Sequence, residues 1–231
     1  MALRDILNWV KEDKQNEAEK FLAQFSQIHT DLVSDRYVQL NQTAKPHQIV
    51  FLGDSITEEF PINEMLPTHT IYNRGISGNT SYDILARLDT HILPLKPSKL
   101  FLLVGINDLA RPLTPKEPIS AIVERISRIH QQIMQHTPEC QFHFISVYPT
   151  NNSNDPKVDK TMLEGRENHK VIALNHQLED YATQHNSPFI NIYPLLLDSQ
   201  KQLDLRYTRE GLHLNVTAYR KILTQLLPYL S

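Results

Sequence analysis

The sequence predicts an α/β fold with three layers, in which a parallel sheet of five strands carries helices on both faces. Short apolar runs without strict alternation recur from residue 48 onward, which is typical of strands buried on both faces. Helical patterns separate these runs, as in β-α units that build a parallel sheet. The chain has 231 residues, 40% of them hydrophobic, so we expect one domain with a sizeable core.

Each expected element can be placed along the chain. The strands are expected at residues 48–52, 70–73, 99–104, 141–147 and 188–192, and the helices at residues 81–92, 118–135, 164–183 and 217–230. A ligand of an open α/β sheet binds outside the carboxyl ends of the strands. Residues that directly follow a strand are therefore the candidates for function. Loops 56–67, 109–117 and 148–161 are expected to wall the ligand pocket, although the last could equally be a solvated connector.

The first 40 residues differ in pattern from the rest. From residue 3 to about residue 34, apolar residues recur at helical spacing around a charged stretch between Lys11 and Lys20, which predicts one long or broken amphipathic helix. We expect residues 1–40 to be a helical extension packed on the single domain formed by residues 1–231. A contact in a homodimer is the alternative use of this helix.

Composition excludes several classes of partner. The formal net charge of −3 provides no basic field for a nucleic acid backbone. The single cysteine, Cys140, excludes an intramolecular disulfide, and charged residues occupy the N-terminus where a signal peptide needs an apolar run. No apolar run approaches the roughly 20 residues that span a bilayer. These features predict a cytoplasmic protein without a membrane span.

The turn after the first strand carries Gly53-Asp54-Ser55-Ile56-Thr57. A hydroxyl at a strand-to-helix turn lies near the free amides of a helix N-terminus, which favour developing negative charge. Ser55 is therefore a candidate nucleophile whose own N–H could help to hold an oxyanion. Alternatively, Asp54 or Ser55 only caps the helix.

Glycine and amide side chains follow the next two strands. Gly75 and Gly78 precede Asn79 after the second strand, and glycine lets the backbone approach a ligand and point an amide at it. Asn107, in the Gly105-Ile106-Asn107-Asp108 run, follows the third strand. Its side chain could donate to an oxyanion, or it could satisfy its own backbone in a turn.

A histidine near the C-terminus completes the candidate set. His213 follows Glu210 by three residues, with Gly211 between them. A neutral imidazole can take a proton from a serine, and a carboxylate can fix its tautomer and stabilise the imidazolium. An exposed loop histidine is the alternative.

These four blocks, in this order, resemble the SGNH hydrolases, also called the GDSL esterase/lipase family. Within the family, the runs that begin at Ile49 and Gly105 look most like the bacterial relatives of the platelet-activating-factor acetylhydrolase α-subunits. The resemblance implies a flavodoxin-like fold, Ser55 as nucleophile and His213 as general base. It also implies an oxyanion hole formed by the N–H groups of Ser55 and Gly78 and by the Asn107 amide, with Asp54 and Asp108 in support.

The acid of the family pattern is usually aspartate, whereas this chain has Glu210 three residues before His213. The extra methylene moves the carboxylate, but glutamate orients histidine in some other hydrolases. Asp204 is a second candidate, although its separation from His213 does not fit the motif. We expect Glu210 to be the acid.

Other site classes lack their motifs. We find no His-x-x-x-His pair with an acid between, no phosphate-binding loop, and no Gly-x-Gly-x-x-Gly after the first strand. We therefore expect neither a metal nor another cofactor. The sequence predicts a serine esterase that cleaves a small acyl ester, with an acetyl group favoured. A catalytically weakened ligand-binding protein of the same fold and an acyltransferase are the alternatives.

Overall fold

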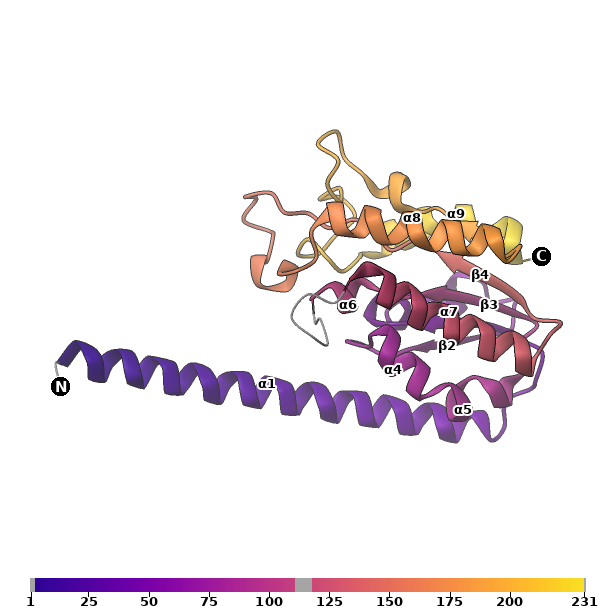
Figure 1. Cartoon of the computed structure of the whole chain (residues 1–231), viewed down its shortest axis with the longest axis horizontal. Coiled ribbons are helices and arrows are strands. Elements are labelled where there is room, and N and C mark those ends of the chain that lie inside the picture. Colours follow the sequence, from indigo (N-terminus) through magenta and orange to yellow (C-terminus); the bar gives the residue numbers. More distant parts are fainter. Residues whose placement is uncertain (1–2, 111–117, 231) are drawn as a thin grey trace.

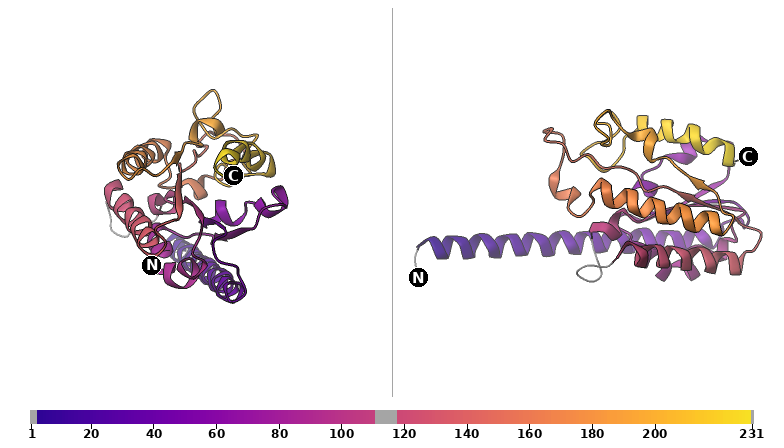
Figure 2. Two further views of the ribbon diagram at one scale, coloured as in Figure 1. Left: turned by 90° about the vertical axis from the view of Figure 1, so that its right-hand side faces the viewer. Right: turned by 45° about the horizontal axis from the view of Figure 1, so that its top comes forward.

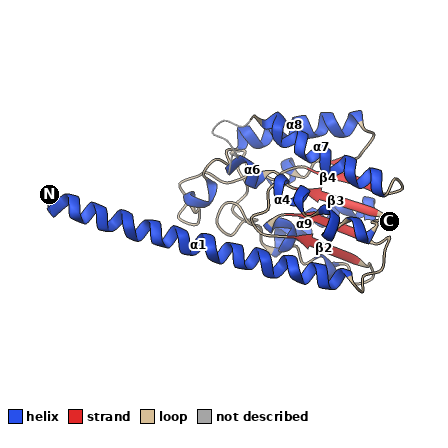
Figure 3. Cartoon of the chain, turned by 60° about the horizontal axis from the view of Figure 1, so that its bottom comes forward, coloured by secondary structure: helices blue, strands red, loops and turns tan. Residues whose placement is uncertain are grey.

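The computed structural model describes residues 3–110 and 118–230, and in them a parallel five-stranded sheet forms the centre of the domain. Its strands are β1 (Ile49–Gly53), β2 (Ile71–Gly75), β3 (Lys99–Leu103), β4 (Gln141–Ile145) and β5 (Phe189–Ile190). Their order across the sheet is β2-β1-β3-β4-β5, the flavodoxin-like order. Figure 3 shows these strands between the helices. The predicted α/β class, the strand number and the parallel sheet are confirmed.

Helices cover both faces of the sheet, as the sequence predicts. The α-helices are α1 (Leu3–Asn41), α2 (Ser55–Glu58), α3 (Ile62–Met65), α4 (Ser81–Ala86), α5 (Leu88–His91), α6 (Ile106–Ala110), α7 (Ile119–His136), α8 (Asn168–Gln184) and α9 (Val216–Leu230). Short 3-10 helices occupy Leu93–Leu95, Lys160–Leu163 and Tyr193–Leu196. None of the helices in this described part of the chain is long and apolar enough to cross a membrane.

Two differences from the predicted helices have tertiary causes. The helix expected at 81–92 is divided at Arg87, whose buried guanidinium donates to the Arg74 carbonyl and the Asn79 side chain. The helix expected at 164–183 begins only at Asn168. Gly165 before it has φ +79°, and a Cβ there would lie 2.7 Å from the Leu109 carbonyl oxygen. The segment before α8 therefore passes so close to α6 that only a glycine fits at position 165.

The core has two parts, one on each face of the sheet. Leu52 and Leu102 face α4, α7 and α8, whereas the neighbouring Phe51 and Phe101 face α2 and α9. The rings of these two phenylalanines stack with centroids 4.7 Å apart. Figure 2 shows α9 on the opposite side of the sheet from α7 and α8. Burial on both faces explains why the strand sequences do not alternate between apolar and polar residues.

The C-terminal part of helix α1 contacts the rest of the domain. Val33 and Tyr37 are buried against Ile76, and the Tyr37 hydroxyl donates to the Gly75 carbonyl over 2.8 Å. Asn41 accepts from the Arg74 guanidinium. The other end of α1 runs away from the domain, past the carboxyl ends of the strands (Figure 1).

Candidate active site

Ser55 is the first residue of α2 and lies two residues after the carboxyl end of β1. The turn needs glycine before it, because a Cβ at Gly53 would lie 2.2 Å from Thr57 Oγ1 and 2.4 Å from the Leu103 carbonyl oxygen. Asp54 caps the new helix by accepting a hydrogen bond of 3.0 Å from the Ile56 N–H. The capping alternative is thus realised by Asp54, and the Ser55 hydroxyl is left to make another contact.

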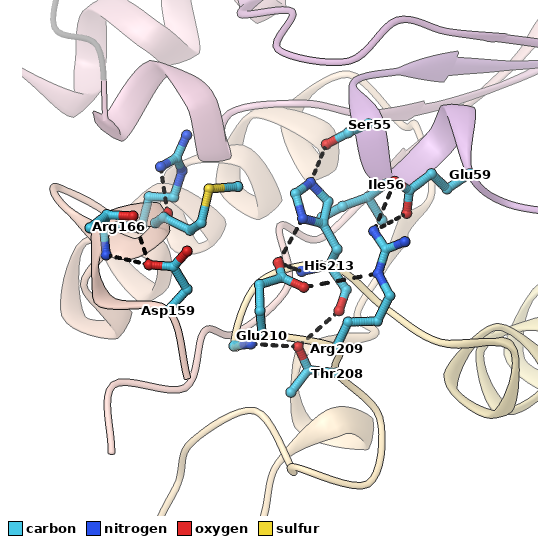
Figure 4. A network of polar contacts seen from close by, with 12 residues as sticks. Ser55, Ile56, Glu59, Asp159, Arg166, Thr208, Arg209, Glu210 and His213 are labelled. Carbon is cyan, nitrogen blue, oxygen red and sulfur yellow. Dashed lines mark hydrogen bonds and ion pairs between the residues drawn. The ribbon is translucent and has the colours of Figure 1, made fainter. Parts of the chain in front are cut away.

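That contact is with His213. Ser55 Oγ and His213 Nε2 are 3.0 Å apart, although the residues are separated by 158 positions. On the other side of the ring, Nδ1 lies 2.6 Å from Glu210 Oε1, and the same oxygen accepts from the His213 backbone N–H over 2.8 Å. Figure 4 shows the hydroxyl, imidazole and carboxylate in sequence. The hydroxyl, the imidazole and the carboxylate therefore form one continuous chain of contacts, the arrangement that a nucleophile, a base and an orienting acid require.

The loop that carries His213 is held in a tight bend. Thr208 Oγ1 accepts from the Gly211 N–H and donates to the His213 carbonyl, both over 2.8 Å. Gly211 has φ +104°, and a Cβ there would lie 2.9 Å from the Asn151 carbonyl oxygen. This bend brings the Glu210 carboxylate back onto the imidazole three residues later.

Glu210 is charged in this setting. Burial would raise its pKa, but the hydrogen bonds from the His213 ring and backbone, together with the charge of Arg209, hold the pKa below its ordinary value. Arg209 is itself bound to Glu59 over 2.7 Å. Asp204, the other candidate acid, is hydrogen-bonded to Arg206 over 2.6 Å. The longer glutamate side chain thus contacts His213, and the described side-chain contacts of Asp204 are with Arg206.

Gly78 lies in the loop after β2 with φ +79°. The preceding Ser77 donates from its backbone N–H and its hydroxyl to Glu58 Oε2, each over 2.6 Å. Glu58 is the last residue of α2, the short helix that begins with Ser55. One carboxylate thus ties the loop that carries Gly78 to the helix that carries Ser55. No sequence motif points to Glu58, because only the fold brings it to Ser77.

Asn107 is buried at the start of α6, and both ends of its amide are engaged. Its Nδ2 donates to the Asn79 carbonyl over 3.0 Å, and its Oδ1 accepts from Arg166 over 2.8 Å. Arg166 also donates to the Met162 carbonyl over 2.7 Å, the bond drawn in Figure 4. Because Arg166 only donates hydrogen bonds, the end of the amide that it contacts must be the oxygen. The N–H groups of Asn107 therefore lie on the opposite side. Arg166 lies in a stretch without a recognisable motif, so the sequence alone does not indicate its contact with Asn107.

The two supporting aspartates are both buried. Asp108 accepts from the Ser81 N–H and from Arg125 and thereby joins α4 to α6. Asp54 uses one oxygen to cap α2, while its second oxygen has no hydrogen-bond partner in the described structure. Burial raises the pKa of Asp54 to about 7, against the opposing charge of His213. This carboxyl group therefore takes up a proton at a higher pH than an exposed aspartate does.

Of the three loops expected to wall the pocket, 56–67 and 148–161 lie within the described residues. Residues 111–117 of the 109–117 loop lie outside the described residues. The 148–161 segment is bound to the histidine loop, because the Asn151 and Asp159 N–H groups donate to the Gly211 and Glu210 carbonyls, each over 2.8 Å. This segment is therefore part of the site's frame rather than a free connector.

Comparison with known protein families gives a match over most of the domain. A model described as the GDSL-like lipase/acylhydrolase family matches residues 51–221. That range includes all the residues at the four strand-end blocks. Among curated proteins, no relative matches the chain.

Solved structures share the fold. A protein from Streptococcus pneumoniae, provisionally described as a platelet activating factor, is 28% identical, with a TM-score of 0.84 over 94% of this chain and 99% of its own. A GDSL-like lipase from Bacteroides thetaiotaomicron is 24% identical, with a TM-score of 0.73 over 85% of this chain and 96% of its own. An acetyl xylan esterase is 18% identical, with a TM-score of 0.65 over 79% and 99%. The last two show the fold alone.

Proposed function

Given that the chain belongs to the GDSL-like lipase/acylhydrolase family and is a hydrolase of ester bonds, we propose that it is a serine esterase for short acyl esters, acetyl esters foremost. The observation that carries this proposal is the chain of contacts from the Ser55 hydroxyl through His213 to Glu210. In such an arrangement the imidazole takes the serine proton while the hydroxyl oxygen attacks a carbonyl carbon.

The proposed reaction has two halves. Ser55 Oγ attacks the ester, His213 Nε2 takes its proton, and the oxyanion is held by the N–H groups of Ser55 and Gly78 and by Asn107 Nδ2. The leaving alcohol departs with the proton from His213, which leaves an acyl group on Ser55. Water then loses a proton to His213 and attacks the acyl carbonyl. When the ester bond to Ser55 breaks, His213 returns this proton to Ser55 Oγ, so the products are a carboxylic acid and the free serine hydroxyl.

A polar cavity next to Gly78, a proposed oxyanion donor, is suited to a polar alcohol, and its lining does not include Ser55 or His213. It has a volume of about 300 Å³, and its lining consists of polar side chains and one glycine: Ser26, Gln27, Thr30, Ser77, Gly78, Asn79 and Asp83. Such a lining offers hydrogen bonds to hydroxyl groups and little apolar contact to a long acyl chain. The acetyl xylan esterase of the same fold makes acetylated sugars sensible test substrates.

A panel of esters tests this function. We expect hydrolysis of p-nitrophenyl acetate, with kcat/KM falling at least tenfold on going to the octanoate, and hydrolysis of acetylated xylo-oligosaccharides. A preference for the octanoate would contradict the short-acyl assignment. A chain that hydrolyses none of these esters and does not react with a fluorophosphonate would instead be the catalytically weakened binding protein. Ester products formed with added alcohols would identify an acyltransferase.

The contacts of Asn107 yield a second prediction. Asn107→Ala removes one oxyanion donor and should lower kcat about a hundredfold or more, as loss of such a donor does in other enzymes. Arg166→Met should lower kcat at least tenfold with little change in KM, because without the Arg166 donor on Oδ1 the amide can turn its oxygen toward the oxyanion.

A double-mutant cycle distinguishes this positioning role from a general structural one. In the Asn107→Ala background, Arg166→Met should have little further effect on kcat, because Arg166 then has no amide to orient. Arg166→Lys should restore part of the lost activity. Arg206→Met, which removes an exposed arginine bound to Asp204, serves as the matched control. Losses that simply multiply in the double variant would reject the positioning role.

A further inference from the structure

A row of large apolar side chains lies exposed on α1. Phe21, Phe25, Ile28 and Leu32 are 67%, 65%, 56% and 66% exposed. They follow one another at intervals of four, three and four residues, the spacing of the apolar seam of a coiled coil. We call these four residues the α1 seam.

The α1 seam points away from the chain's own domain. At 3.6 residues per turn, its four residues lie within about 60° of one another around the helix. Val33, Tyr37 and Asn41, which contact the domain, lie about 110–190° from the centre of the seam on the same geometry. The helix thus uses one side to bind its own domain and exposes its most apolar side to solvent.

The length and position of α1 make this exposure unusual for a monomer. The helix has 39 residues, about 58 Å at 1.5 Å per residue, and its N-terminal part extends beyond the domain (Figure 1). A helix gains most of its stability from packing of an apolar face. The match to the pneumococcal structure covers 94% of the chain, which leaves too few residues unmatched to omit α1.

We propose that the α1 seam of a second copy of this chain covers the first, so that the protein is a homodimer joined through paired α1 helices. The area of the seam supports a second copy. Two phenylalanines of about 200 Å² each at two-thirds exposure, with the isoleucine and leucine, offer roughly 400–500 Å² per copy. The four seam residues alone thus supply half or more of the roughly 800 Å² per partner that stable interfaces bury.

A second copy also meets the symmetry requirement. A two-fold axis through the seam pairs the same patch of both copies, so that each contact occurs twice. Because each domain lies on the opposite side of its own α1, the two domains stay on the outside of the helix pair. A different protein would need its own apolar helix or surface to cover the seam. A second copy of this chain already has one.

Pairing would also affect the candidate site. Ser26, Gln27 and Thr30, in the same stretch of α1, line the polar cavity next to Gly78. His29 Nε2 lies 3.1 Å from Glu58 Oε1, on the carboxylate that holds Ser77. Dimerisation therefore fixes the helix that walls this cavity. This consequence for catalysis rests on the proposed function, whereas the dimer itself does not.

Sedimentation or light scattering of the full-length chain tests the proposal without any substrate. We expect the wild type to have twice the monomer mass of 26.8 kDa at micromolar concentration. Phe25→Glu/Ile28→Glu should be monomeric, because charges replace two seam contacts. Lys20→Glu, at an exposed residue about 110° from the centre of the seam, reverses a charge outside the seam and should stay dimeric. Phe25→Ala/Ile28→Ala, which adds no charge, should raise the dissociation constant at least tenfold.

Two results would overturn the dimer. One is a wild type that stays monomeric up to about 100 µM, including a monomer that binds phospholipid vesicles through the seam. The other is a Phe25→Glu/Ile28→Glu variant that keeps the dimer mass with an unchanged melting temperature. Neither result bears on ester hydrolysis, so failure of the dimer and failure of the proposed function are separately visible.

Discussion

Replacement of Ser55 by alanine should reduce ester hydrolysis to the background rate, a loss of at least about a thousandfold in kcat, while the protein stays folded. The hydroxyl is the atom that His213 Nε2 contacts at 3.0 Å, and no acyl-enzyme can form without it. The oxyanion donors would remain, and such donors alone give only residual catalysis over water. The side chain loses a single oxygen at the start of a short helix, so the melting temperature should change little.

Covalent labelling provides the second readout. A fluorophosphonate reacts with a serine that an adjacent base activates, so the wild type should gain one adduct on Ser55 and the alanine variant none. Ser199→Ala, at an exposed serine, is the control and should keep both activity and labelling. Hydrolysis of p-nitrophenyl acetate at the wild-type rate by the Ser55→Ala variant would end the assignment of the nucleophile.

Much of the fold could be predicted because its signals are local. Each predicted strand overlaps an observed one, and helices α7 and α9 begin within one residue of the predicted starts. The carboxyl ends of parallel strands lie at one edge of the sheet, so the sequence alone predicts that Ser55 and Asn107 lie close together. The glycines at 53 and 78 mark bends that few other residues permit.

The parts that could not be predicted depend on contacts between distant segments. Glu58 and Arg166 act on Ser77 and Asn107, respectively 19 and 59 positions away, and nothing near either residue indicates its partner. The break at Arg87 likewise follows from a guanidinium that folds inward onto β1 and β2. For α1, periodicity indicates a helix with an apolar face, but not whether that face covers the domain or another copy.

Glu210→Gln should lower kcat by about a thousandfold or more, by analogy with the same change of acid to amide in a serine protease triad. The glutamine oxygen can still accept from the His213 backbone N–H. In the wild type the same carboxylate oxygen also faces Nδ1. Where the amide turns its N–H group to Nδ1 instead, the imidazole carries its proton on Nε2 and cannot accept the Ser55 proton. The charge that stabilises the imidazolium is lost as well. KM for a small ester should change little, since Glu210 contacts His213 rather than substrate.

The pH dependence of the wild type follows from the same carboxylate. The pKa of Glu210 is held below its ordinary value, so its contact with His213 is complete at neutral pH and is lost only as the pH falls through that lowered pKa. The kcat of the wild type, measured between pH 5 and 8, should therefore show no change that comes from protonation of Glu210. Glu210→Asp, which shortens the reach by one methylene, should retain more activity than Glu210→Gln, because the negative charge remains.

Asp204→Asn is the control that separates the two candidate acids. Asp204 binds Arg206 over 2.6 Å, and its described contacts do not include His213, so this variant should keep kcat within about threefold. The opposite pattern, full activity in Glu210→Gln and loss in Asp204→Asn, would transfer the orienting role to Asp204. It would also require the loop around Gly211 to rearrange in solution, because Glu210 Oε1 lies 2.6 Å from His213 Nδ1 in the folded chain.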